Sequence, residues 1–434
     1  MATDFLRMDR RELMAGFGAA SLGLILPGRS AAQGPQPVSL QLRRDTLNIR
    51  PGGPETPICM LSAPELHFRR GESPQIEIAS ELALSTAFHW RGIDGTPAIE
   101  PLVGRPPLAP GGRESLPIST RHAGTFLCDL SLLADPKALP ARAMPLIVAE
   151  SEAIGVDYDA TLLVEEWRLR ADATARLPGA DDNETAIFYT LNGKPSFDVL
   201  ARTNDRLRLR FINGSPRTVI ALKLESVDVT VMAIDGEPAE PFPARNGALV
   251  LAPGGRVDTF VDVAAPGGSN LKILLHDGKQ TRTIGFIIVP RDPPTRAAPL
   301  PPPGSLPSNG LPPRLDLKNA LRVELALNGP DWIAPASFAV TSQPAFRSKT
   351  GRVAVLALAN RAATTTVFHL HGHHFRLLDR LDDGWKPFWL DTLAIEPGQT
   401  QRVAFLAEHA GRYLIESVAA DWAKPRFVRW YAVE

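Results

Sequence analysis

The chain carries an internal repeat, and this repeat restricts its fold more than any other feature does. Leu108–Arg113, with the sequence Leu-Ala-Pro-Gly-Gly-Arg, recurs as Leu251–Arg256, and a third version, Ile-Glu-Pro-Gly-Gln-Thr, spans Ile395–Thr400. The proline residues of successive copies are 143 and 144 positions apart. Because self-similarity at a fixed period marks repeated structural units, we expect three related units in the chain.

Each copy of this Pro-Gly turn leads into a segment with the character of a strand. In the clearest case, residues 256–263 alternate polar and apolar side chains, which predicts a half-buried strand. Alternating segments also precede the three turns, at 73–78, 205–210 and 351–356. The 41 Pro and 34 Gly suit short strands joined by turns. The sequence therefore predicts an all-β protein made of three consecutive β-sandwich domains.

Composition indicates where these domains begin and end. We expect the first domain at 38–155, the second at 158–292 and the third at 316–434. Residues 293–315 lie in a proline-dense stretch that includes Pro301-Pro302-Pro303, which predicts an extended, semi-rigid linker.

The N-terminal segment, residues 1–33, has the features of an export signal. Arg10 and Arg11 precede an apolar run from Ala15 to Leu26, and small residues at 30–32 offer a cleavage site. The run is too short to span a membrane, and the arginine pair favours the twin-arginine route to the periplasm. The alternatives are an N-terminal anchor or a chance arginine pair.

Charge and cysteine content narrow the possible partners. The 47 basic residues balance the 47 acidic ones, so no net charge draws the protein to nucleic acid or to an anionic membrane. No stretch after the signal is long and apolar enough for a transmembrane segment. Cys59 and Cys128 are the two cysteines. In an oxidising compartment they could pair, and the sequence leaves that question open.

A histidine-rich motif, Phe-His-Leu-His-Gly-His-His at 368–374, is the strongest chemical signal. Residues i and i+2 of a strand point to the same face about 7 Å apart, so His369 and His371 can present both imidazoles to one metal ion. An earlier motif, Phe-His-Trp-Arg-Gly, has the same layout, with His89 followed by Arg91 at the position of the second histidine.

With the repeats and the linker in the same order, these motifs resemble the signature regions of the multicopper oxidases, the family of laccases and bilirubin oxidases. The resemblance covers nearly the whole chain after the signal. It implies three cupredoxin-like Greek-key domains, one type 1 copper site that receives electrons and a three-copper cluster that reduces oxygen.

The residues at the matching positions differ from the family's copper ligands. At the type 1 site the resemblance matches Thr366, Ser417 and Trp422 to the His, Cys and His ligands, and the axial Met falls near Phe427. Of eight cluster histidines, three are kept, namely His89, His369 and His371. The other five positions hold Arg91, Asp129, Ser131, Glu416 and Val418. Laccase-type oxidase activity is therefore not expected, and no catalytic residue is assigned.

The three retained histidines have two interpretations. Two or three neutral imidazoles suffice for one divalent ion, so His89, His369 and His371 are candidate ligands of a single copper ion. Alternatively, they form hydrogen bonds to Asp129, Glu416 or the backbone and no metal binds. The cofactor is accordingly none or one copper ion.

The resemblance extends to a copper-free, exported member of the family that supports cell division. It implies a non-catalytic periplasmic binding or scaffold protein, with cell-envelope or division proteins as partners. The alternative is a copper-binding protein or oxidoreductase that uses a residual mononuclear copper site.

Overall fold

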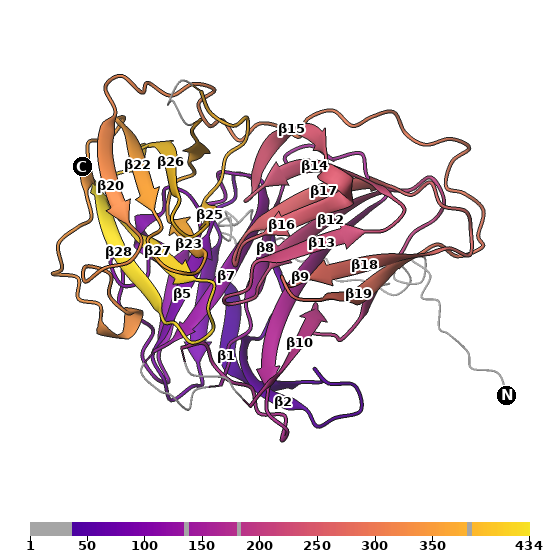
Figure 1. Ribbon diagram of the computed structural model, residues 1–434, viewed down its shortest axis with the longest axis horizontal. Coiled ribbons are helices and arrows are strands. Elements are labelled where there is room, and N and C mark those ends of the chain that lie inside the picture. The colour runs from indigo at the N-terminus through magenta and orange to yellow at the C-terminus, as the bar shows by residue number, and fades with distance from the viewer. Residues whose placement is uncertain (1–36, 134–138, 180–183, 380–383) are drawn as a thin grey trace, which may run out of the picture. The chain divides into compact units, whose positions relative to one another are not determined.

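The computed structural model describes residues 37–133, 139–179, 184–379 and 384–434. From Pro37 to Glu434 the chain forms one compact unit. The predicted export signal lies outside the described residues. The described residues form six β-sheets, which pair into three sandwiches in chain order (Figure 1).

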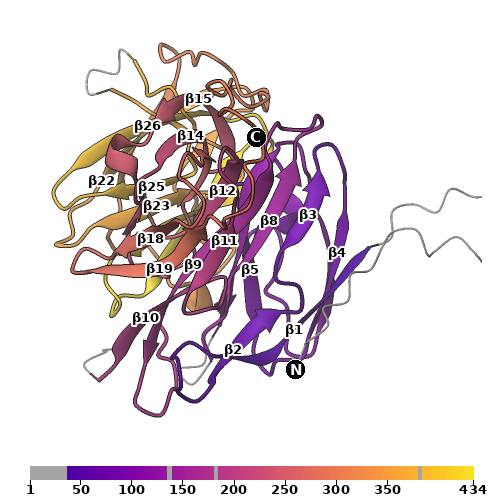
Figure 2. The ribbon, with the colours of Figure 1, turned by 90° about the vertical axis from the view of Figure 1, so that its right-hand side faces the viewer.

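The first sandwich packs two four-stranded sheets around one apolar core (Figure 2). One sheet has the order β2 (Thr56–Leu61), β1 (Val38–Leu47), β4 (Gln75–Ser80) and β6 (Arg113–Pro117). The other has the order β3 (Leu66–Arg69), β8 (Met144–Ala149), β7 (Gly124–Leu132) and β5 (Thr86–Arg91). A short 3-10 turn, η1 (Pro97–Ile99), follows β5.

The second sandwich is larger. Its first sheet has the order β10 (Ala186–Leu191), β9 (Tyr158–Leu169), β12 (Arg206–Asn213), β17 (Arg256–Asp262), β14 (Asp228–Ile234) and β15 (Glu237–Pro243). Its second sheet has the order β11 (Phe197–Leu200), β19 (Thr281–Ile288), β18 (Asn270–His276), β13 (Ile220–Leu224) and β16 (Ala248–Leu251), which η2 (Arg245–Gly247) precedes.

The third sandwich contains the histidine-rich motif. One sheet has the order β20 (Leu321–Ala326), β22 (Val353–Ala359), β26 (Thr400–Leu406) and β24 (Arg376–Leu377). The other has the order β21 (Arg347–Ser348), β28 (Arg426–Val433), β27 (Gly411–Ala419), β23 (Thr366–Leu370) and β25 (Thr392–Ile395). A turn, η3 (Pro335–Ser337), lies between β20 and β21.

The sequence repeat corresponds to a repeated strand arrangement. In each sandwich a parallel pair (β1 with β4, β9 with β12, β20 with β22) is extended by an antiparallel strand that follows the Pro-Gly turn. Gly111, Gly254 and Gly398 in these turns have φ values of 63°, 78° and 74°. This conformation favours glycine because it lacks a Cβ. The predicted all-β fold of three consecutive cupredoxin-like sandwiches is confirmed, while the residues chosen as domain boundaries stay a prediction.

The prediction that residues 256–263 form a half-buried strand is wrong. β17 is buried along nearly its whole length, because its polar side chains face the first sandwich instead of water. Asp258 accepts hydrogen bonds from Thr125 of β7 (2.6 Å), Arg208 (2.7 Å) and Arg210 (2.9 Å). The alternating pattern is real, but the polar face of β17 is buried. Asp258 forms ion pairs with Arg208 and Arg210 of its own sandwich and a hydrogen bond with Thr125 of the first.

We expect Asp258→Asn to lower the free energy of unfolding by about 2–3 kcal/mol at pH 7, since charged hydrogen bonds are lost. Burial alone would raise the pKa of Asp258, but Arg210 and Arg208 hold it below its ordinary value. A lowered carboxyl pKa stabilises the fold above the unfolded-state pKa of about 3.9 and loses this contribution as the pH falls below it. Urea unfolding at pH 7 and pH 3.5 should therefore show a smaller pH effect in the variant. The exposed Asp228→Asn is the control, and equal pH effects in wild type and Asp258→Asn would contradict the assignment.

The proline-rich segment 293–315 runs without strands and is held to the sandwiches at several points. The Asn309 side chain accepts a hydrogen bond from the backbone amide of Ala123 and donates one to its carbonyl, each 2.9 Å long. Leu306 and Leu315 are buried.

Two further predictions concern the cysteines and the membrane. Cys59 and Cys128 are free thiols buried in the first core. In the described part of the chain, no helix has the length and apolar character needed to cross a bilayer.

Candidate functional site

The candidate site lies where the first and third sandwiches meet. Strand β5 contributes His89 and Arg91, and β7 contributes Asp129, which is paired with His89 across the sheet. Strand β27 contributes Glu416, and His371 follows the end of β23. His89, Glu416 and His371 are buried to 4% exposure or less. These side chains therefore interact in a region from which water is largely excluded.

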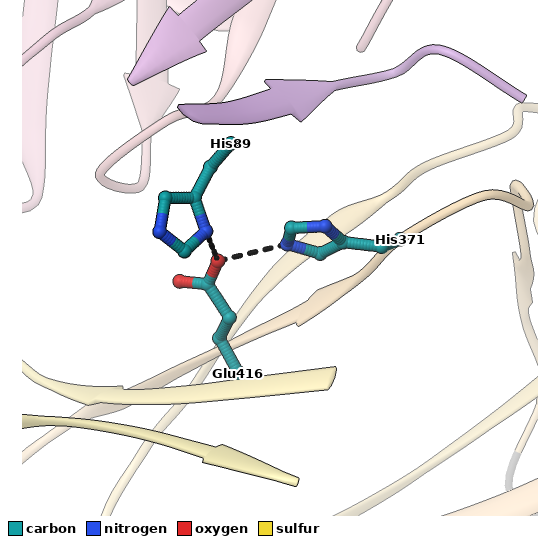
Figure 3. A group of neighbouring side chains, drawn as sticks. All are labelled: His89, His371 and Glu416. Carbon is teal, nitrogen blue, oxygen red and sulfur yellow. Dashed lines mark hydrogen bonds and ion pairs between the residues drawn. The ribbon is translucent and has the colours of Figure 1, made fainter. Parts of the chain in front are cut away.

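Glu416 joins the two histidines (Figure 3). One of its oxygens, Oε1, lies 2.9 Å from His89 Nδ1 and 2.8 Å from His371 Nε2. The two imidazole rings are arranged edge to face, with centroids 5.8 Å apart. The other oxygen, Oε2, accepts a hydrogen bond of 3.1 Å from Arg91 Nη2. Both oxygens of this buried carboxylate are therefore engaged.

His371 lies between two carboxylates. Its Nε2 faces Glu416, and its Nδ1 lies 3.2 Å from Glu100 Oε2. Burial alone would lower the pKa of His371, but Glu100 and Glu416 together raise it to about 9. His371 is therefore an imidazolium at neutral pH. Glu100 was missed by the sequence analysis, because it lies outside both histidine motifs, in the loop after η1.

Two arginines complete the charge balance. Arg91 donates a hydrogen bond of 3.0 Å to Asp129 as well as its bond to Glu416. Arg426, the first residue of β28, also pairs with Asp129 and lies 3.6 Å from Glu416. Although burial alone would raise the pKa of Glu416, Arg91 and Arg426 hold it well below the ordinary value. The network thus contains three cations and three carboxylates: Arg91, Arg426 and His371 against Asp129, Glu416 and Glu100. Arg426 was not predicted, since no metal-ligand pattern includes it.

His369, the third predicted metal ligand, has a different environment. Its Nδ1 lies 2.9 Å from the Thr392 hydroxyl. Burial and the nearby Arg91 hold the pKa of His369 well below its usual value, so the ring is neutral. Together with Arg91, Asp129 and Arg426 it lines a cavity of about 390 Å³. The structure therefore brings His89 and His371 together with Glu416, and leaves His369 outside this group of donors.

The residues that the resemblance matches to the electron-entry ligands form contacts within the protein. The Thr366 hydroxyl donates to Asn360 (3.1 Å), and the Ser417 hydroxyl donates to the carbonyl of Leu327. The Trp422 ring stacks under the guanidinium of Arg168, 4.2 Å from its centroid. A blue-copper site needs a thiolate and two imidazoles, and none of these three side chains supplies one. The hydroxyl groups are used in the protein's own hydrogen bonds.

Comparisons with known proteins agree with this architecture. Residues 314–434 match the family model described as multicopper oxidase. The multicopper oxidase MmcO of Mycobacterium tuberculosis is 24% identical over 438 residues, covering 88% of this chain and 82% of that protein. The C-terminal part of the chain therefore matches the multicopper oxidase model, and most of the chain is similar to a multicopper oxidase.

Solved multicopper oxidase structures share its fold. A multicopper oxidase from Pseudomonas thermotolerans superimposes with a TM-score of 0.80 at 24% identity, covering 92% of this chain and 99% of that one. Lac15, from a marine microbial metagenome, gives a TM-score of 0.75 at 25% identity, covering 92% and 100%. The chain shares the fold of these proteins, and ion pairs lie between its first and third sandwiches.

Proposed function

We propose that this multicopper oxidase family member is a non-catalytic binding or scaffold protein of the periplasm, to which its arginine-pair signal predicts export. The observation that carries the proposal is the position of Arg91. Its guanidinium bridges Asp129 and Glu416 within the buried group that contains His89 and His371. A guanidinium remains protonated at any physiological pH, so a metal ion cannot displace its charge as it displaces a proton.

The surrounding charges support the same conclusion. Arg91 and Arg426 already neutralise Asp129 and Glu416, and Glu100 pairs with the protonated His371. A divalent ion at Glu416 would add two positive charges beside two fixed guanidinium groups in a medium of low dielectric constant. It would also have to remove the proton of His371. Because Glu100 and Glu416 raise the pKa of His371, competition with this proton weakens metal binding at pH 7.

One observation favours a second candidate, a mononuclear copper site. His89 Nδ1 lies 2.9 Å from Glu416 Oε1 without the angles of a hydrogen bond. Within the described residues, neither ring nitrogen of His89 has a hydrogen-bond partner. His89, His371 and Glu416 together present three donors that lie within 4.8 Å of one another. A single ion held there would give a copper-binding protein, still without a thiolate route for electrons.

Copper loading distinguishes the two candidates. We expect purified protein that has been incubated with Cu(II) and dialysed to show no blue thiolate–copper absorption and no oxygen consumption with a phenolic substrate. The copper content per chain is then compared with that of His89→Ala and His122→Ala. Copper lost in His89→Ala and kept in His122→Ala would establish the mononuclear site. Blue colour with oxygen consumption would contradict the proposal of a non-catalytic protein.

A further inference from the structure

A second group of metal-binding side chains lies apart from the Arg91 network. It consists of Asp94, His122, Glu237 and His374. Asp94 follows β5 and His122 precedes β7, both in the first sandwich, while Glu237 begins β15 of the second sandwich and His374 follows β23 of the third. Three sandwiches thus contribute donors to one small volume.

Donor atoms of Asp94, His122 and His374 lie within 4.8 Å of one another, and Glu237 adjoins His122. His374 Nδ1 lies 2.8 Å from Asp94 Oδ2, and His122 Nδ1 lies 2.6 Å from Glu237 Oε1. Asp94 Oδ2 and His122 Nδ1 are 3.9 Å apart. In a tetrahedral zinc site with bonds of about 2.0–2.2 Å, neighbouring donors lie roughly 3.3 Å from one another. Shifts of about 0.7 Å or less would bring these measured pairs to that separation.

The orientation of His374 is the one that metal-bound histidines adopt. Its Nε2 lies 2.9 Å from the backbone carbonyl of Asp235 and donates to it, which directs Nδ1 toward Asp94. Histidine ligands almost always donate the remaining ring N–H to a carbonyl or carboxylate in this way.

Glu237 and His122 supply an independent observation. Glu237 is 2% exposed, and its Oε1 has no hydrogen-bond partner among the described residues. His122 Nδ1 also has none, although the two atoms are 2.6 Å apart, because the angles are not those of a hydrogen bond. Buried polar atoms normally have partners, so two neighbouring atoms that lack a hydrogen bond are available to a ligand beside them.

The charges also differ from those of the Arg91 network. The recorded ion-pair partners of Asp94 are His122 and His374, and that of Glu237 is His122. In the described parts of the chain, no lysine or arginine forms an ion pair with either carboxylate. Burial alone would lower the pKa of His374, but Asp94 raises it to about 10, so a metal ion would have to displace this proton, as it would at His371. Unlike the guanidinium groups of the Arg91 network, this positive charge can be displaced.

We propose that Asp94, His122, Glu237 and His374 form a binding site for one divalent transition-metal ion of the zinc type. Two imidazole nitrogens and two carboxylate oxygens suit tetrahedral Zn²⁺. All four positions are filled by protein, as in structural zinc sites, so the ion links the three sandwiches. It does not depend on the copper chemistry of the family.

The test is zinc titration of the full chain after chelator dialysis. Isothermal titration calorimetry with ZnCl₂ should give about one equivalent for wild type, with at least tenfold weaker binding in His122→Ala and in Glu237→Gln. Zinc should raise the unfolding temperature of wild type and have little effect on either variant. His89→Ala and the exposed-strand variant His276→Ala serve as controls that retain zinc.

Three outcomes would overturn the proposal. These are no zinc binding by wild type, unchanged binding in both His122→Ala and Glu237→Gln, and loss of binding confined to His89→Ala. The His122 side chain is 12% exposed, so comparison of the unfolding temperatures of His122→Ala and wild type without zinc separates loss of the donor from loss of packing. X-ray absorption of the zinc-loaded protein gives a second readout, with two imidazole and two oxygen ligands expected.

Discussion

Replacing Arg91 with methionine is expected to lower the free energy of unfolding by about 3–5 kcal/mol. The guanidinium of Arg91 is 4% exposed and bonds to both Asp129 and Glu416. Methionine fills part of the same volume but leaves these carboxylates with Arg426 and His371 as their remaining cations. A buried carboxylate that loses its partner retains the cost of desolvation, which exceeds what the ion pair itself contributes.

Urea-induced unfolding of Arg91→Met and wild type provides the measurement. Arg113→Met is the matched control, because Arg113 is exposed on β6 and the same substitution there should change stability by less than about 0.5 kcal/mol. The double variant Arg91→Met/Glu416→Gln should lose less free energy of unfolding than the two single variants lose in sum, because the two residues are in direct contact. Equal stabilities of Arg91→Met and Arg113→Met would show that the network does not hold the sandwiches together.

The second large effect is expected at Gly254, in the middle copy of the repeated turn. Its φ is 78°, and an added Cβ would lie 2.9 Å from Arg91 Cδ and 3.1 Å from His369 Cε1. At Gly111 and Gly398, which have similar φ values, an added Cβ would meet nothing within 4 Å. Alanine should therefore cost about 1–2 kcal/mol at Gly111 and Gly398 from backbone strain alone. At Gly254 it should cost about 3 kcal/mol or more, because Arg91 is held by two carboxylates.

The three alanine variants form their own control series. Unfolding midpoints in urea should rank Gly254→Ala well below the other two, which should be nearly equal. If all three variants lose the same stability, the middle turn does not pack against the Arg91 network as described. The comparison is informative because backbone conformation is common to the three sites and only the neighbours differ.

The fold could be predicted because its determinants are local and repeated. The three Pro-Gly turns and the alternating segments around them indicate strands by their own periodicity, and three similar units imply three sandwiches. The sequence also predicts that the electron-entry copper site is missing, because Thr366, Ser417 and Trp422 offer neither a thiolate nor an imidazole. Of the three histidines predicted to converge, His89 and His371 lie side by side, with ring centroids 5.8 Å apart, while His369 is outside their group of donors.

Tertiary packing decided the rest. Glu100 and Arg426 lie outside the histidine motifs, and their roles depend on the contact between the first and third sandwiches. The polar residues of β12 and β17 face another sandwich, which alternation alone cannot distinguish from water. His122 and His374 gain Asp94 and Glu237 as neighbours only when three sandwiches meet. Periodicity determines which side of a strand a residue occupies, but the charges that surround it come from distant segments, and these determine its protonation and its capacity to bind metal.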